Sequence, residues 1–162
     1  MKAMNRTIIQ SPVGRLLLAS RDGMLCQVRP AQDGERADQS DPVLDEAKRQ
    51  LAQYFAGERR SFHLPLQANG SEFDRAVWRL LEEIPFGEIR TYGQLAAALG
   101  KPKASRAVGG ACSRNPLLIV VPCHRVIAGS GRLTGFAAGL EMKRALLVHE
   151  GQQVCGERIQ IK

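Results

Sequence analysis

The chain has 162 residues, of which 44% are hydrophobic and 24% are charged, with a formal net charge of +7. These values suit one ordinary domain or two small ones, and they exclude a disordered or fibrous protein. No wholly apolar run is longer than residues 117–121, which is too short to cross a bilayer. The N-terminal residues lack the apolar core of a secretion signal, and the four cysteines show no CxxC spacing. We therefore expect a cytoplasmic protein with reduced thiols, no metal site and no membrane partner.

The positive charge is unevenly distributed along the chain. Residues 89–140 contain seven basic side chains and no acidic one. A stretch of this length without a carboxylate indicates a surface that meets a polyanion. A basic surface kept for solubility is the alternative.

The first part of the chain predicts a small sheet followed by a helix. Three short strands are expected between residues 6 and 30, separated by a Ser-Pro-Val-Gly turn and an Arg-Asp-Gly turn. Asp41 and Pro42 predict the start of a helix whose apolar residues recur at helical spacing as far as Phe55. Residues 61–66 are a candidate for one more strand.

The pattern changes from strand to helix after the segment Gln-Ala-Asn-Gly at residues 67–70. Ser71 then predicts the start of a helix with one apolar face. We expect an α+β fold, in which a small N-terminal sheet-plus-helix module, residues 1–68, precedes a mostly helical C-terminal domain, residues 69–162.

Two short helices joined by a tight turn predict a helix-turn-helix at about residues 91–115. Thr91 opens the first helix with a capping box, and Ser105 opens the second. Gly109 and Gly110 weaken the second helix by roughly 1 kcal/mol each, but they let another backbone or DNA approach closely. Two core helices that pack at a glycine contact would show the same pattern.

The sequence Pro-Cys-His-Arg at residues 122–125 is the strongest candidate for chemistry. A buried cysteine is more often an inert core thiol. Three features favour a reactive Cys123: His124 follows it directly, the neighbourhood is basic, and Glu150 lies at the end of the next expected helix, at about residues 140–148.

The geometry of an extended segment limits how these groups cooperate. Neighbouring side chains on such a segment point to opposite faces, so water or a turn must join Cys123 to His124. Glu150 would then orient the imidazole while the imidazole takes the thiol proton. His149 could replace His124 in this arrangement, whereas His63 is expected to be structural.

The segments IPFGEIRTYGQLA, RAVGGACSRNP, VVPCHRVI and LLVHEG, in this order and spacing, resemble the O(6)-alkylguanine-DNA alkyltransferases, also called methylated-DNA–protein-cysteine methyltransferases. The similarity is close over residues 71–151 and looser before them. The resemblance implies a ribonuclease-H-like N-terminal module and a single-use repair protein. Such a protein flips O(6)-alkylguanine, and less readily O(4)-alkylthymine, out of the duplex and transfers the alkyl group irreversibly to its own cysteine. It also implies a monomer without cofactor whose partner is double-stranded DNA containing alkylated bases.

The resemblance assigns roles to individual residues. Cys123 matches the alkyl acceptor, His124 the base that acts through water, and Glu150 the orienting partner of the base. Asn115 matches an asparagine that braces the turn between the recognition helix and the active-site segment. Tyr92 matches a tyrosine that crowds the phosphate and donates to the base.

The resemblance further implies that the recognition helix enters the minor groove, where small side chains suit the narrow space. Arg106 matches the finger that takes the place of the flipped base. The residues expected to contact DNA are Arg106, Tyr92, Thr91, Ser105, Ala107, Gly109, Ala111 and Arg114. The residues expected to line the alkylguanine pocket are Tyr92, Cys112, Val126, Leu133, Phe136, Ala137 and Ala138; Cys112 could pack or act as a secondary thiol.

The chain departs from the family pattern at residues 136–138, where Phe-Ala-Ala replaces a tyrosine and a small polar residue. Side-chain hydrogen bonds from this loop are therefore missing, although the backbone N–H of Ala137 remains available. Two other functions stay open: a lesion sensor without chemistry, and a cysteine hydrolase. The cysteine counts against a sensor, and the basic segment and recognition helix count against a hydrolase.

Overall fold

The computed structural model describes residues 4–159, which form two compact units. Unit 1 contains the described residues up to Ala68 together with Pro116–Val120. Unit 2 contains Asn69–Asn115 and the described residues from Val121 onward. Within residues 4–159, no helix is both long and apolar enough to cross a membrane. The expected α+β fold class, with an N-terminal sheet module and a mostly helical C-terminal part, is confirmed.

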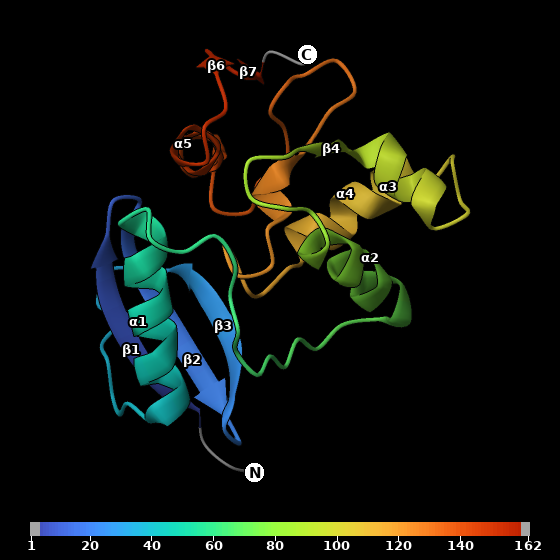
Figure 1. The fold of residues 1–162 in the computed structure, drawn as a ribbon. Coiled ribbons are helices and arrows are strands. Elements are labelled where there is room, and N and C mark those ends of the chain that lie inside the picture. The colour runs from blue at the N-terminus through green and yellow to red at the C-terminus, as the bar shows by residue number, and fades with distance from the viewer. Residues whose placement is uncertain (1–3, 160–162) are drawn as a thin grey trace. The chain divides into compact units, whose positions relative to one another are not determined.

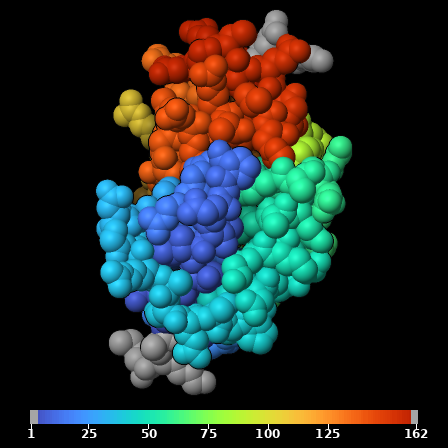
Figure 2. All heavy atoms as spheres, turned by 90° about the vertical axis from the view of Figure 1, so that its left-hand side faces the viewer, coloured from blue at the N-terminus to red at the C-terminus, as the bar shows by residue number. Residues whose placement is uncertain are grey.

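Unit 1 is a three-stranded antiparallel sheet with one helix across a face (Figure 1). The strands are β1 (Asn5–Ser11), β2 (Gly14–Arg21) and β3 (Met24–Pro30), in the predicted meander order. The helix α1 (Pro42–Phe55) starts at Asp41, whose carboxylate accepts from Leu44 N at 2.8 Å. In Figure 2 the side chains of the first strands (blue) pack directly against the blue-green segment that contains α1. Residues 16–19 of the central strand are fully buried, so β2 forms the middle of this core.

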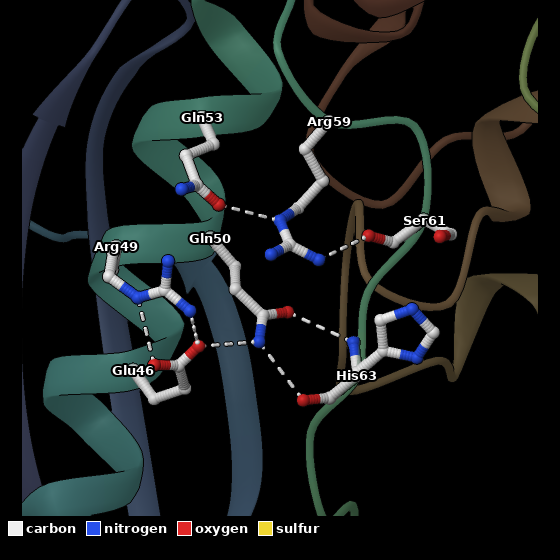
Figure 3. Close-up of polar contacts among 7 residues, drawn as sticks. All are labelled: Glu46, Arg49, Gln50, Gln53, Arg59, Ser61 and His63. Atoms are coloured by element: carbon white, nitrogen blue, oxygen red, sulfur yellow. Dashed lines mark hydrogen bonds and ion pairs between the residues drawn. The ribbon is translucent and has the colours of Figure 1, made fainter.

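The chain after α1 does not form the strand expected at residues 61–66. It makes only an isolated parallel bridge between Leu66 and Leu25. A side chain of α1 replaces the missing strand neighbour: Gln50 Oε1 accepts from His63 N at 2.9 Å, and Gln50 Nε2 donates to His63 O at 3.0 Å (Figure 3). The backbone of His63 is therefore satisfied without a ladder of main-chain bonds.

Residues 116–120 belong to unit 1, although the expected boundary placed them in the C-terminal domain. Val28 N donates to Pro116 O at 2.9 Å and Leu118 N donates to Val28 O at 3.0 Å, so the segment bridges to the open edge of β3. The expected extended run is also interrupted. Ile119 has a φ of 72°, in the left-handed region that a β-branched residue rarely adopts, so the chain turns there.

Unit 2 is mostly helical, and two of its helices form the predicted helix-turn-helix. The helices are α2 (Glu72–Glu82), α3 (Tyr92–Ala98), α4 (Ser105–Ser113) and α5 (Leu140–His149). The two helices of the motif, α3 and α4, pack against each other, and α4 also packs against α2 (Figure 1). The short strands β4 (Arg90–Thr91) and β5 (Val126–Ile127) pair in parallel, and β6 (Val154–Cys155) and β7 (Arg158–Ile159) form a hairpin.

Side chains cap the starts of α2 and α3 but not those of α4 and α5. Ser71 and Thr91 each form a capping box, at α2 and α3. Ser105 was expected to cap α4, but the helix begins with Ser105 after Ala104, and no side chain caps it. Because α4 also contains two glycines, its own sequence stabilises it little.

Candidate active site and nucleic-acid interface

Cys123, His124 and Arg125 form one buried turn, the 3-10 helix η1 (Cys123–Arg125). This differs from the extended segment expected from the sequence. Cys123 N donates to Val121 O at 2.8 Å and Arg125 N donates to Pro122 O at 3.0 Å. The tight turn replaces the extended chain, in which the side chains of Cys123 and His124 would point to opposite faces.

Glu150 collects the hydrogen bonds of this turn. Its Oε2 lies 2.8 Å from His124 Nε2, and its two oxygens accept from Arg125 Nε at 2.7 Å and Nη2 at 2.9 Å. Burial raises the pKa of the Glu150 carboxyl, but the hydrogen bonds from His124 and Arg125 outweigh it and hold the pKa well below its ordinary value. Glu150 is therefore ionised at neutral pH and orients the imidazole.

His124 is neutral, and one of its ring nitrogens has no partner among the described residues. Its side chain is fully buried, and this burial lowers its pKa although Glu150 acts in the opposite direction. With the proton of the neutral ring on Nε2, facing Glu150, the lone pair lies on Nδ1. Nδ1 is buried and has no hydrogen-bond partner within residues 4–159. The arrangement makes Nδ1 available as a proton acceptor. His149, the alternative base, instead packs edge-on against Phe86 with ring centroids 6.2 Å apart.

Asn115 joins the end of α4 to the thiol. Its Nδ2 donates to Val121 O at 2.8 Å and to Cys123 Sγ at 3.2 Å. Burial raises the pKa of Cys123 to about 11, while the hydrogen bond from Asn115 and the charge of Lys143 act to lower it. The resting group is a thiol, so it must lose its proton before it can attack.

Two buried cations of the site received no role from the sequence. Arg125 belongs to the quoted motif, and its Nη1 donates to Ile84 O at 2.5 Å. Lys143, only 1% exposed, donates from Nζ to Val126 O at 2.6 Å and to Thr134 O at 2.8 Å. Burial lowers the pKa of Lys143 to about 8. Its position four residues before the buried Leu147 is a helical spacing that could have indicated burial.

A cavity of about 430 Å³ lies beside Tyr92. Tyr92 donates from its hydroxyl to Thr134 O at 2.9 Å, and a Cβ atom on Gly135 would stand 3.6 Å from that hydroxyl, so the loop backbone lies in contact with the tip of this side chain. Of the residues expected at the DNA or in the pocket, Tyr92, Ser105, Arg106 and Gly109 line this cavity. Gly110, Ser113, Thr134 and Gly135 line it as well and were not expected.

Three expected residues have other contacts. Ala111 is fully buried and its carbonyl accepts from Trp78 Nε1 at 2.9 Å, so the expected DNA contact of Ala111 is wrong: it lies on the face of α4 that packs against α2. Leu133 packs in a hydrophobic cluster with Ile127 and other core residues, and so supports its loop from within. Arg114 is bound to Asp74.

The remaining expected residues are placed as follows. Thr91 caps α3, and Ala107 lies exposed on α4. In the expected pocket set, Cys112, Val126 and Phe136 are buried, Ala137 is exposed and Ala138 is half-buried. No cluster of three or more His, Cys, Asp or Glu side chains in the described part of the chain is arranged to hold a metal ion.

A family model described as "6-O-methylguanine DNA methyltransferase, DNA binding domain" matches residues 72–152, and its "ribonuclease-like domain" matches residues 4–68. A methylated-DNA–protein-cysteine methyltransferase of Methanosarcina acetivorans is 47% identical over 154 residues, which cover 91% of this chain and 99% of the relative. The constitutive enzyme of that name from Bacillus subtilis is 42% identical over 152 residues, covering 88% and 92% of the two chains.

Solved structures lead to the same group of proteins. The crystal structure of the Mycobacterium tuberculosis O6-methylguanine methyltransferase superposes with a TM-score of 0.84 at 40% identity, covering 91% of this chain and 93% of that one. The Mycobacterium tuberculosis OGT in complex with DNA gives a TM-score of 0.81 at 44% identity, with 90% and 91% covered. This chain belongs to the methylated-DNA–protein-cysteine methyltransferase family.

Proposed function

We propose that this chain transfers the alkyl group of O(6)-alkylguanine in duplex DNA to Cys123, irreversibly and once per molecule. DNA repair by alkyl transfer to a cysteine is the function of the family to which it belongs. The observation that carries the assignment to Cys123 is the buried network around it. Asn115 donates to its sulfur. The residue after Cys123, His124, is a neutral imidazole that Glu150 orients and whose Nδ1 has no partner within residues 4–159.

The reaction is an in-line displacement at the alkyl carbon. The Cys123 proton moves to His124 Nδ1, through water, and the imidazolium that forms is stabilised by the ionised Glu150. A sulfur–carbon bond forms as the carbon–oxygen bond to guanine breaks, which requires the two reacting atoms to lie about 3–3.5 Å apart. The departing guanine oxygen needs a hydrogen-bond donor, and the backbone N–H of the exposed Ala137 is the candidate. No tetrahedral intermediate forms, so no oxyanion hole is needed.

Access to a base in duplex DNA requires that the base leave the stack. The cavity beside Tyr92 is lined by Arg106 and Gly109 of α4, so a recognition helix and a pocket meet at one place. The exposed Arg106 is suited to fill the space that the flipped base leaves. Extrusion costs a few kcal/mol, and less where pairing is already weakened, which favours damaged bases without a strong sequence preference.

The remaining proposals concern the organisation of the chain. The recognition helix and the Cys123 network both belong to unit 2 of a single chain, which supports action as a monomer. The N-terminal module is expected at residues 1–68, and residues 4–68 match a ribonuclease-like domain. Its proposed role is structural support. The molar mass from light scattering during gel filtration, measured with and without duplex DNA, tests whether the protein is a monomer.

Mass spectrometry of the intact protein tests the proposed function. After mixing with a duplex that carries one O(6)-methylguanine, we expect the wild type to gain one methyl group, located on Cys123 and saturating at equal molar amounts. Cys123→Ala should gain none while still binding the lesion, and Cys155→Ala, which removes an exposed cysteine, is the matched control that should react like the wild type. Methylation of Cys123→Ala would place the acceptor elsewhere. Tight lesion binding without any gain of mass in the wild type would indicate a sensor, and neither binding nor transfer would favour the hydrolase.

A further inference from the structure

The C-terminal end of α4 is held by two side chains of α2. Arg114, which follows the last residue of α4, donates from Nε to the two oxygens of Asp74 at 3.2 and 3.1 Å and from Nη2 to Oδ1 at 2.7 Å. One turn further along α2, Trp78 Nε1 donates to Ala111 O at 2.9 Å. Asp74 is 5% exposed, whereas the Arg114 side chain is 56% exposed. A buried carboxylate is therefore paired with a guanidinium that reaches the surface.

The helix α4 depends on such contacts from outside. It has no side-chain cap at its start, and Gly109 and Gly110 each cost about 1 kcal/mol relative to alanine. Gly110 also leaves room for the ion pair, since a Cβ atom there would stand 3.1 Å from Arg114 Nη1. The place where α4 ends is thus set by α2 more than by the sequence of α4 itself.

The next residue after Arg114 is the one that touches the thiol. Asn115 N donates to Cys112 O at 3.2 Å, which continues the last turn of α4, and Asn115 Nδ2 donates to Cys123 Sγ at 3.2 Å. A shift at the end of α4 would therefore move the amide away from the sulfur. The hydrogen bond from Asn115 lowers the pKa of Cys123, so the shift would also change how readily the thiol ionises.

We propose that the Asp74–Arg114 ion pair is a positioning device that holds Asn115 against the acceptor thiol, and that Arg114 does not serve as a phosphate contact. An arginine that turned to a phosphate would leave the buried Asp74 carboxylate with a hydrogen bond from Ser71 N but without its cationic partner, which is a costly arrangement. The hydrogen bonds from Arg114 hold the pKa of the Asp74 carboxyl below its ordinary value, so the carboxylate is ionised in the pair. This inference rests on the proposed role of Cys123.

The test compares Asp74→Asn and Arg114→Met with the wild type in three measurements. These are the rate of benzyl transfer from free O(6)-benzylguanine, the pH dependence of Cys123 alkylation by iodoacetamide, and the salt dependence of binding to unmodified duplex DNA. We expect both variants to react about tenfold more slowly with the free base and to shift the iodoacetamide profile upward by about one pH unit, the size of one hydrogen bond to a charged group. The salt slope should stay at the wild-type value.

A phosphate role for Arg114 predicts a different result. Arg114→Met would then lower the slope of log affinity against log salt by about 1. Asp74→Asn would leave that slope unchanged, and both variants would react with the free base and with iodoacetamide like the wild type. This combination would overturn the inference. Arg114→Lys, which keeps the charge and one donor, should restore part of the free-base rate if the pair positions Asn115.

Further controls distinguish a loss of positioning from a failure to fold and from a failure of the proposed function. Asp38→Asn removes an exposed Asp–Arg pair with Arg6 in unit 1 and should match the wild type in all three measurements. If Asp74→Asn does not fold, the Arg114 variants carry the test, because Arg114 is exposed. If the wild type transfers neither a benzyl group from the free base nor a methyl group from the O(6)-methylguanine duplex, the proposed function fails, whereas the iodoacetamide profile and the salt slope still decide the role of the pair.

Discussion

The two units bury different kinds of polar side chain. Within the described residues, the buried polar groups of unit 1 are Thr7, Ser20 and Gln50, all neutral. Those of unit 2 are Asp74, Asn115, His124, Arg125, Lys143 and Glu150, and five of these six are ionisable. Burying a charge is costly unless it is paired, so a fold does not gain stability by collecting such groups. The neutral buried polar groups of unit 1 are consistent with a structural role. The concentration of buried ionisable groups in unit 2 indicates that the chemistry lies there.

Removing the central carboxylate of unit 2 should have the largest effect. Glu150→Gln keeps the shape of the side chain but brings an NH₂ group among the donors of His124 and Arg125. We expect the free energy of unfolding to fall by about 3–5 kcal/mol, as for a broken buried ion pair. Transfer should slow by about 10²–10⁴-fold, because the base loses its orientation. Urea unfolding and single-turnover transfer measure the two effects.

The matched control for this change is Glu157→Gln. Glu157 pairs with Arg132 at the surface, at 3.4 Å, with both side chains 59% exposed. Its loss should leave stability and transfer near the wild-type values. Equal effects at Glu150 and Glu157 would contradict the distinction between buried and exposed charge on which the comparison depends.

The surface of unit 2 should matter only for duplex DNA. Arg106 is exposed on α4 and lines the cavity without joining the buried network. We expect Arg106→Ala to slow repair of a duplex by about 10- to 100-fold, because the cost of extruding the base is no longer offset. Reaction with free O(6)-benzylguanine should change little. Equal losses with the two substrates would remove the finger role from Arg106.

A buried neutral group of unit 1 should affect stability alone. Gln50→Ala leaves both backbone groups of His63 without their partner, which should lower the free energy of unfolding by about 1–3 kcal/mol. The transfer rate at a temperature where the variant is folded should stay within about twofold of the wild type. Gln53→Ala, on the same helix, removes only a contact with Arg59 and should cost less (Figure 3). A slow but stable Gln50→Ala would show that unit 1 does more than support.

Local signals explain what could be predicted of the fold. Asp41, Ser71 and Thr91 cap helices where the sequence placed them, because a cap and the first turn that it serves lie within a few residues. The clamp of Gln50 on His63 and the turn at Ile119 depend on segments that are distant in the chain or on the backbone of a neighbouring strand. The residue pattern within each of these segments therefore could not predict the hydrogen bonds of His63 or the turn at Ile119.

The site shows the same division. The motif around Cys123 and His124 and the carboxylate of Glu150 were expected together. In the structure Glu150 lies against His124, and the neighbouring Cys123 accepts from Asn115. Lys143 was missed because a lysine in a helix usually lies at the surface. Its burial depends on two carbonyl groups, at Val126 and Thr134, that only the folded loop presents.

The smallest expected effect is a change in pH dependence at Lys143. Burial lowers its pKa to about 8 in the folded protein from an ordinary value of 10.5, so between these values the unfolded chain binds more protons. Stability therefore rises with pH as Lys143 deprotonates, by about 1 kcal/mol between pH 7.5 and 9. Lys143→Met lacks this contribution. The charge of Lys143 also lowers the pKa values of Cys123 and Cys112, which act in the opposite direction near pH 9, so both proteins are compared in a Cys112→Ala/Cys123→Ala background.

The difference between wild type and Lys143→Met thus isolates the lysine. Urea unfolding at pH 7.5, 8.25 and 9 should show the wild type gaining stability relative to the variant at each step. Arg144→Met, which changes an exposed neighbour on α5, should run parallel to the wild type. A constant difference between wild type and Lys143→Met over this range would mean that the lysine stays charged in the folded protein. Its three oxygen neighbours, the carbonyls of Val126 and Thr134 and the Tyr92 hydroxyl, would then solvate the charge as well as water does.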